Sequence, residues 1–224
     1  MQRNHFEHII TSYGLLAQKV DDWFQRCCSN QPEAIACKRG CSDCCRGLFD
    51  ITILDAALLS KGVVGLGPAV REPLAFKARS RLEALKLVLP EFSFPWLLNR
   101  FSEEYVTNQL IDDDAPCIFL NDAGECIVYD FRPLTCRLHG IPAYDMHDDC
   151  YSDEHCSLNF IGVKLPHPQL ARADFPGIFR EEQKLLTLLT NELFGFPVGR
   201  CDTLIPAAVC VDYQEMIVTE TSSD

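Results

Sequence analysis

Long apolar runs are missing from this sequence. Its apolar stretches are short and interrupted by charged residues, whereas a helix that crosses a membrane needs about 20 mostly apolar residues. The first residues lead directly into an amphipathic pattern, and they lack the apolar segment and the cleavage site of a secretory signal peptide. From these two absences we expect a cytoplasmic protein without a membrane partner.

Positive charge is also scarce. The 224 residues include 20 Lys and Arg against 32 Asp and Glu, which gives a formal net charge of −12 at pH 7. Binding to nucleic-acid phosphates needs clustered basic side chains. The nearest such group, residues 77–86, falls within a helical pattern and is interpreted as a solvated face. We therefore expect no nucleic-acid partner, while a protein partner is compatible with the composition but not identified by it.

Cysteine, in contrast, is abundant, with 13 residues. In a reducing compartment this abundance indicates metal ligation or redox chemistry rather than a disulfide framework. The densest group is Cys37, Cys41, Cys44 and Cys45, in the pattern C-x3-C-x2-C-C. Thiolates are soft ligands that suit zinc and iron–sulfur clusters, and spacings of two to four residues let one loop present two sulfurs to one ion.

The adjacency of Cys44 and Cys45 argues against one self-contained site. Side chains of neighbouring residues start in divergent directions, so both thiols are hard to place on one tetrahedral ion. Either one of them faces a second metal centre, or one is a structural thiol. The later cysteines supply further ligands, and the predicted composite site contains seven: Cys37, Cys41, Cys44, Cys45, Cys117, Cys126 and Cys136. Spacing does not choose an eighth ligand among Cys150, Cys156, His139 and water.

These pieces resemble a known family. The chain carries Cys37-x3-Cys41-x2-Cys44-Cys45, then Cys117-Ile-Phe-Leu, then Cys126-Ile-Val-Tyr-x2-Arg-Pro-x2-Cys136-Arg137. In this order they are similar to the YkgJ-type CxxCxxCC cysteine-cluster family, whose members are described as zinc- or iron-chelating domains. The resemblance covers residues 37–140 and implies metal binding through the seven cysteines. Similarity to larger proteins with this domain, such as certain flagellin lysine methylases, makes an iron–sulfur cluster a further expectation.

Three functions are compatible with these observations. The first is a metal-binding protein that chelates zinc or iron without catalysis. The second is a metalloenzyme, although Ser-His-Asp, phosphate-loop and dinucleotide signatures are absent and the radical-SAM-like spacing of Cys37, Cys41 and Cys44 lacks the repeated βα pattern of that barrel. The third is a redox sensor using adjacent cysteines, which the strain of such disulfides disfavours. Arg132 and Arg137, beside Cys136, have two interpretations: cations that offset thiolate charge, or partners of surface carboxylates.

Helical periodicity predicts the fold class. Apolar residues recur at helical spacing in five segments, residues 5–28, 51–59, 70–89, 96–111 and 180–194. Thr52 and Asp55 occupy capping-box positions, and Gly62 is the predicted stop of that helix. A small β-hairpin is predicted over residues 117–129 and a strand over residues 207–211. We expect a mainly α protein with a small β-hairpin and irregular cysteine-rich metal-binding loops.

The domain organisation is predicted to be simple, because no repeat or low-complexity linker divides the chain. We expect a single domain over residues 1–224. Its cysteine-cluster core is residues 37–140, and residues 1–36 and 141–224 are extensions packed on it. Residues 219–224 are expected to form a frayed end.

Overall fold

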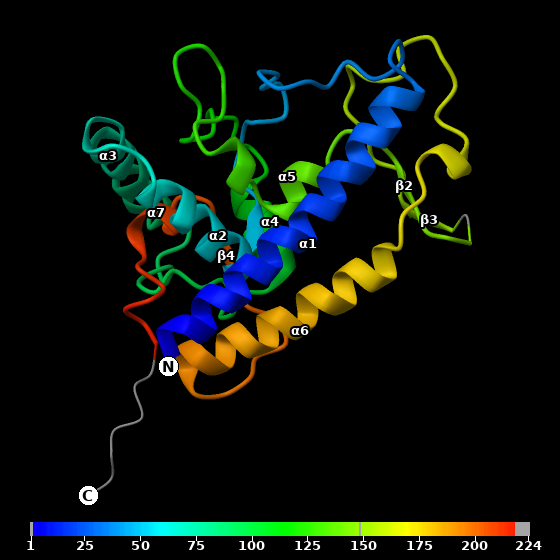
Figure 1. Cartoon of the computed structure of the whole chain (residues 1–224). Coiled ribbons are helices and arrows are strands. Elements are labelled where there is room, and N and C mark those ends of the chain that lie inside the picture. The colour runs from blue at the N-terminus through cyan, green and yellow to red at the C-terminus, as the bar shows by residue number, and fades with distance from the viewer. Residues whose placement is uncertain (1, 148, 218–224) are drawn as a thin grey trace, which may run out of the picture.

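The computed structural model describes residues 2–147 and 149–217, and the predicted frayed end at residues 219–224 lies outside them. The predicted fold class is confirmed: helices dominate, and the β structure is limited to short strands (Figure 1). None of the helices in the described ranges is long and apolar enough to cross a membrane.

Two long helices, α1 (Gln2–Asn30) and α6 (Phe175–Phe194), lie side by side and run in opposite directions (Figure 1). The Trp23 ring, near the end of α1, packs edge-on against Phe175 at the start of α6, with ring centroids 5.1 Å apart. Both side chains are buried. The apolar spacing that predicted these two helices therefore corresponds to the faces they bury against each other.

Helix α2 (Ile53–Val64) begins with the predicted capping box. The Thr52 hydroxyl accepts a hydrogen bond from the Asp55 backbone N–H (3.2 Å), and the Asp55 carboxylate accepts one from the Thr52 N–H (3.3 Å). The predicted stop at Gly62 is wrong, because the helix continues past it. A Cβ at Gly62 would lie 2.7 Å from the Phe131 ring, so close packing explains this glycine.

Helices α3 (Pro68–Leu85) and α4 (Glu103–Leu110) follow. Helix α4 is shorter than predicted. Trp96, the expected first residue, has a φ of 64° and lies outside the helical region. The helix starts instead after Ser102, whose hydroxyl accepts a hydrogen bond from the Tyr105 N–H (3.2 Å).

The strands form two small antiparallel sheets. Strand β1 (Asp50–Thr52) pairs with β4 (Asp202–Leu204), and β2 (Ala143–Tyr144) pairs with β3 (Cys150–Ser152). The first sheet joins the segment after the cysteine loop to the C-terminal part of the chain. Neither sheet is the hairpin predicted over residues 117–129.

The strand predicted over residues 207–211 is wrong, because this segment forms the short helix α7 (Ala207–Cys210). Pro206 precedes it with φ −61° and ψ −28°, values of the right-handed helical region. The Val211 N–H donates to the Ala207 carbonyl (3.0 Å) and closes one helical turn. The fixed φ of proline favours the start of a helix at this point.

Shorter helical segments lie between these elements: η1 (Tyr129–Phe131), α5 (Leu134–Leu138) and η2 (Pro168–Leu170). The largest hydrophobic core combines buried side chains of α1, α2 and α6 with Phe119 and Leu134 from the cysteine-rich part of the chain. The cysteine-bearing segments thus pack against the same core as the long helices.

Candidate metal centre

Backbone pairing joins the first cysteine loop to the later cysteines. The Cys117 N–H donates to the Cys45 carbonyl (2.9 Å), and the Gly47 N–H donates to the Ala115 carbonyl (2.9 Å). Between these bonds, residues 46 and 116 form an isolated antiparallel bridge. Two cysteines that are distant in the sequence are therefore held side by side by the main chain.

A tight turn places Cys126 beside this pairing. The Ile127 N–H donates to the Phe119 carbonyl (2.9 Å), and Cys126 makes a single bridge with Leu120. The Asn121 side-chain oxygen accepts the N–H groups of residues 123 and 125, at 3.0 and 2.9 Å. The turn chemistry predicted here is therefore present, but the strand pairing is limited to this single bridge, so no regular β-hairpin forms in these residues.

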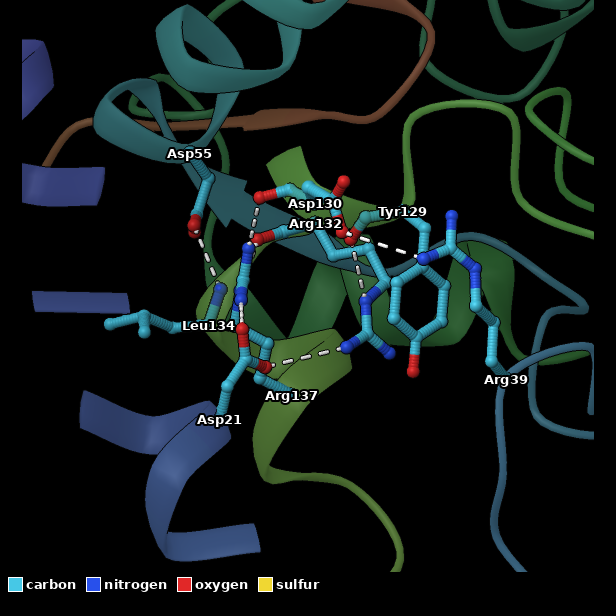
Figure 2. A network of polar contacts seen from close by, with 8 residues as sticks. All are labelled: Asp21, Arg39, Asp55, Tyr129, Asp130, Arg132, Leu134 and Arg137. Atoms are coloured by element: carbon cyan, nitrogen blue, oxygen red, sulfur yellow. Dashed lines mark hydrogen bonds and ion pairs between the residues drawn. The ribbon is translucent and has the colours of Figure 1, made fainter. Parts of the chain in front are cut away.

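Cys136 lies on the short helix α5, which polar contacts fix to the rest of the molecule (Figure 2). The buried Arg137 guanidinium pairs with Asp21 of α1. It also donates to the backbone carbonyls of Arg132 (2.8 Å) and Asp130 (2.7 Å). Arg137 is thus a structural partner that orients the segment around Cys136.

Arg132 has a different position. Its guanidinium stacks on the Tyr129 ring at 3.6 Å from the centroid, and Arg39 approaches the same ring at 4.7 Å. Arg132 also lines the cavity beside the cysteines. Its positive charge lowers the pKa of the Cys44, Cys126 and Cys136 thiols, against the larger effects that raise each of them. Arg132 also pairs with the Asp21 carboxylate at 3.4 Å, the same carboxylate that Arg137 contacts. Carboxylate pairing therefore fits both arginines, and charge compensation fits Arg132 in addition.

The predicted cysteines line two adjoining cavities. The larger, of about 360 Å³, has an apolar wall that includes Phe49, Phe119 and Ile205. Six of the seven predicted ligands line it: Cys41, Cys44, Cys45, Cys117, Cys126 and Cys136. The smaller cavity, of about 80 Å³, is lined by the seventh, Cys37, together with Cys41, Cys44 and Cys136. The fold therefore gathers the whole predicted set around one region.

Burial opposes ionisation of several thiols in this region. Burial raises the pKa of Cys37 and of Cys117 to about 11 each. Burial also raises the pKa of Cys126 and of Cys136. Metals bind the thiolate form, so a metal ion would displace these protons on binding.

Cys44 and Cys45 differ from each other. A hydrogen bond between the two side chains contributes to a raised pKa of Cys44 and a lowered pKa of Cys45. Cys44 is exposed, whereas Cys45 is partly buried. Whether the two thiols serve one ion or two stays a prediction.

Electrostatic interactions group the thiols around Cys45 and around Cys37, and Cys44 interacts with both of these residues. Cys45 interacts with Cys117, Cys126 and Cys136. Cys37 interacts instead with Cys41, Cys44 and Cys156. No three His, Cys, Asp or Glu side chains in the described ranges are placed closely enough to hold a common ion. Metal coordination by either group would therefore require side-chain rotation.

Sequence spacing did not single out Cys156 among the four candidates for an eighth ligand. The structure places it near Cys37 through the buried Asn159, whose amide donates to the Cys37 sulfur (3.4 Å) and to the Gly140 carbonyl (2.5 Å). The Cys156 N–H donates to the same carbonyl (3.3 Å). Gly140 has a φ of 114°, and a Cβ there would lie 3.2 Å from the Cys37 sulfur. A glycine at this position was the available sequence signal for a close approach.

The other candidates are placed less favourably. Cys150 is exposed on β3 and lines neither cysteine cavity. His139 is exposed but lines both cavities. All 13 cysteines lie within the described ranges and carry free thiols.

Comparisons with other proteins add nothing to this geometry. No family model, no curated protein and no solved structure matches the chain significantly.

Proposed function

We propose that this protein binds zinc or iron, the latter in the form of an iron–sulfur cluster or of single ions, through two groups of cysteine thiols in a reducing cytoplasm. The observation that carries the proposal is the convergence of all seven predicted cysteines on two adjoining cavities, although they come from distant segments. Soft thiolates in sets of four suit tetrahedral zinc and iron–sulfur clusters. The resemblance of residues 37–140 to the YkgJ-type family supports the same proposal.

In this proposal the two groups form separate centres. One centre takes Cys45, Cys117, Cys126 and Cys136. The other takes Cys37, Cys41 and Cys44, with Cys156 as the eighth thiol of the set. Cys44 and Cys45 then belong to different centres, although their side chains are in contact before metal binds.

Metal content after anaerobic purification tests the proposal. Zinc, iron and acid-labile sulfide are measured together with the visible spectrum. Stoichiometric zinc in a colourless protein supports the zinc form, and iron with sulfide in a brown protein supports the cluster form. A protein that contains and takes up none of these contradicts metal binding.

Serine variants test the division into two centres. Cys126→Ser and Cys41→Ser are each expected to lose about half of the bound metal, because each removes one ligand of one centre. The matched control is Cys150→Ser, an exposed cysteine outside both cavities, which should keep the full content. Loss of all metal in both test variants would contradict two independent centres.

A metalloenzyme is the second candidate, and the larger cavity favours it. This cavity, of about 360 Å³, is lined by Arg132, Thr135 and His139 as well as by the thiols. A metal bound there would therefore have polar side chains beside it. Catalysis at a metal requires an open coordination position. Added imidazole or azide should then change the absorption spectrum of the cobalt-substituted protein, whereas a closed four-thiolate centre should leave it unchanged.

A further inference from the structure

Asp55 is a charged side chain inside the protein, with an exposed fraction of 2%. Both of its oxygens are used. One accepts hydrogen bonds from the Tyr13 hydroxyl (2.7 Å) and from the Leu134 N–H (2.9 Å). The other is bonded by the Thr52 N–H (3.3 Å) and the Thr52 hydroxyl (3.2 Å). A buried carboxylate with four donors is a well-satisfied anion and is costly to disturb.

The donors come from three different parts of the fold. Tyr13 lies in the middle of α1, Thr52 caps α2, and Leu134 is the first residue of α5. The capping box of α2 thus has a second use. Its acidic member reaches beyond its own helix and binds the start of another one, as the Asp55–Leu134 bond in Figure 2 shows.

Helix α5 depends on this bond because it has no cap of its own. The residue at its N-cap position is Pro133, which makes no side-chain capping bond. The first N–H groups of a helix have no partner within the helix and need one from elsewhere. Asp55 supplies that partner at Leu134, and Cys136 follows within the next turn.

Asp55 itself lines neither cysteine cavity. Its connection to Cys136 is the hydrogen bond to Leu134, which lies two residues earlier in the same helix.

We infer that Asp55 is a positioning residue of the metal centre: by capping α5 from α2, it sets the orientation in which Cys136 offers its sulfur. This inference rests on the proposed function. Partners that orient metal ligands typically change metal affinity by about 10- to 100-fold when they are removed. Asp55 acts on the ligand through the backbone rather than through a hydrogen bond to the ligand itself.

Cobalt binding to Asp55→Asn tests the inference. Cobalt affinity is measured by chelator competition, and the intensity of the thiolate-to-cobalt charge-transfer band reports how many sulfurs bind. We expect about a 10-fold or greater loss of affinity at one centre and a weaker band, because the amide cannot accept bonds from all four donors. Tyr13→Phe removes only one donor and should give a smaller change in the same direction.

The control is Thr190→Val, on α6. It removes another buried hydroxyl, which accepts a hydrogen bond from the Val198 N–H (2.8 Å) and lies outside both cysteine cavities. It should lower thermal stability without changing the cobalt spectrum. If Asp55→Asn behaves like this control, Asp55 is only structural and the inference is wrong. If the unmodified protein binds no cobalt, zinc or iron, the proposed function fails and the positioning role fails with it.

Discussion

The helix pair α1–α6 and the cysteine-bearing segments 37–47 and 115–140 differ in what fixes their side chains. Between the helices, apolar residues such as Trp23 and Phe175 are buried against each other. Around the cysteines, the chain follows turns and isolated bridges, and the thiols line cavities. Burial of apolar area stabilises the first region by itself, whereas the second region would gain stability from the metal that we propose it binds.

Metal removal should separate the two regions most strongly. Structural zinc sites contribute roughly 10 kcal/mol or more of binding free energy, and this energy is coupled to folding. After anaerobic removal of metal with a chelator, amide hydrogen exchange should accelerate in segments 37–47 and 115–140 and change little in α1 and α6. Equal acceleration in both regions would mean that the metal stabilises the protein as a whole, and no change would count against bound metal.

The substitution Trp23→Ala should weaken the helix pair and leave the cysteine region intact. It removes a large, fully buried side chain between the long helices, and such substitutions cost about 3–5 kcal/mol. Urea unfolding should show this loss, while the metal content of the folded protein stays unchanged. A variant that folds but loses its metal would show that the cysteine region depends on the helix pair more closely than we propose.

Gly47→Ala acts where the first cysteine loop pairs with the segment before Cys117. Gly47 has a φ of 75°, and an added Cβ would lie 2.7 Å from the Asp113 carbonyl oxygen. The left-handed backbone alone costs about 1–2 kcal/mol, and the close contact adds to it. We expect weaker metal binding by competition assay. The matched substitution Gly195→Ala, at a similar φ of 77° with open space around it, should affect stability only.

Glu182→Gln, on α6 in the helical region, should change the stability of the protein the least among these substitutions. Burial, followed by the charge of Asp55, raises the pKa of Glu182 from 4.5 to about 7. The folded protein therefore holds this proton more tightly than the unfolded chain, so stability is greatest below pH 4.5 for this group and decreases as the pH rises to 7. Because Glu182 is partly exposed, the change is on the order of 1 kcal/mol.

The hydrogen bond from Tyr13 acts against this direction. The Tyr13 hydroxyl lies 2.7 Å from Asp55 and 3.3 Å from Glu182. Its bond to Glu182 lowers the pKa of that carboxyl, but burial has the larger effect. Denaturant unfolding between pH 5 and pH 7 should show a flatter profile for Glu182→Gln than for the unmodified protein. Parallel profiles would exclude Glu182 as the titrating group.

Sequence reasoning succeeded where local rules decide the structure. The long helices follow from apolar periodicity, and the capping box of Thr52 and Asp55 follows from spacing along one chain segment. Residue type and spacing selected seven cysteines, and these line two adjoining cavities, while their role as metal ligands stays a prediction. Side-chain capping at Ser102 shortened a helix whose periodicity extended further, which shows how one polar residue can override an apolar pattern.

Tertiary contacts account for what the sequence did not reveal. Helix α5 is too short for a periodic signal, and its cap comes from Asp55, far away in the chain. The proximity of Cys156 to Cys37 depends on Asn159 and Gly140, neither of which belongs to a cysteine motif. Gly62 was interpreted as a helix stop, although its role is to admit the Phe131 ring.

The backbone bond between Cys45 and Cys117 also has a consequence for the length of the chain between them. This bond closes a large loop that contains α2, α3 and α4. The entropic cost of closing a flexible loop grows only with the logarithm of its length, by about 0.6 kcal/mol for each doubling. Insertions in the exposed part of the connection after α3, at residues 87–88, should therefore be tolerated at little cost. The number of residues between the two cysteine-bearing segments is then free to vary, whereas the backbone pairing of Cys45 with Cys117, which closes the loop, is not.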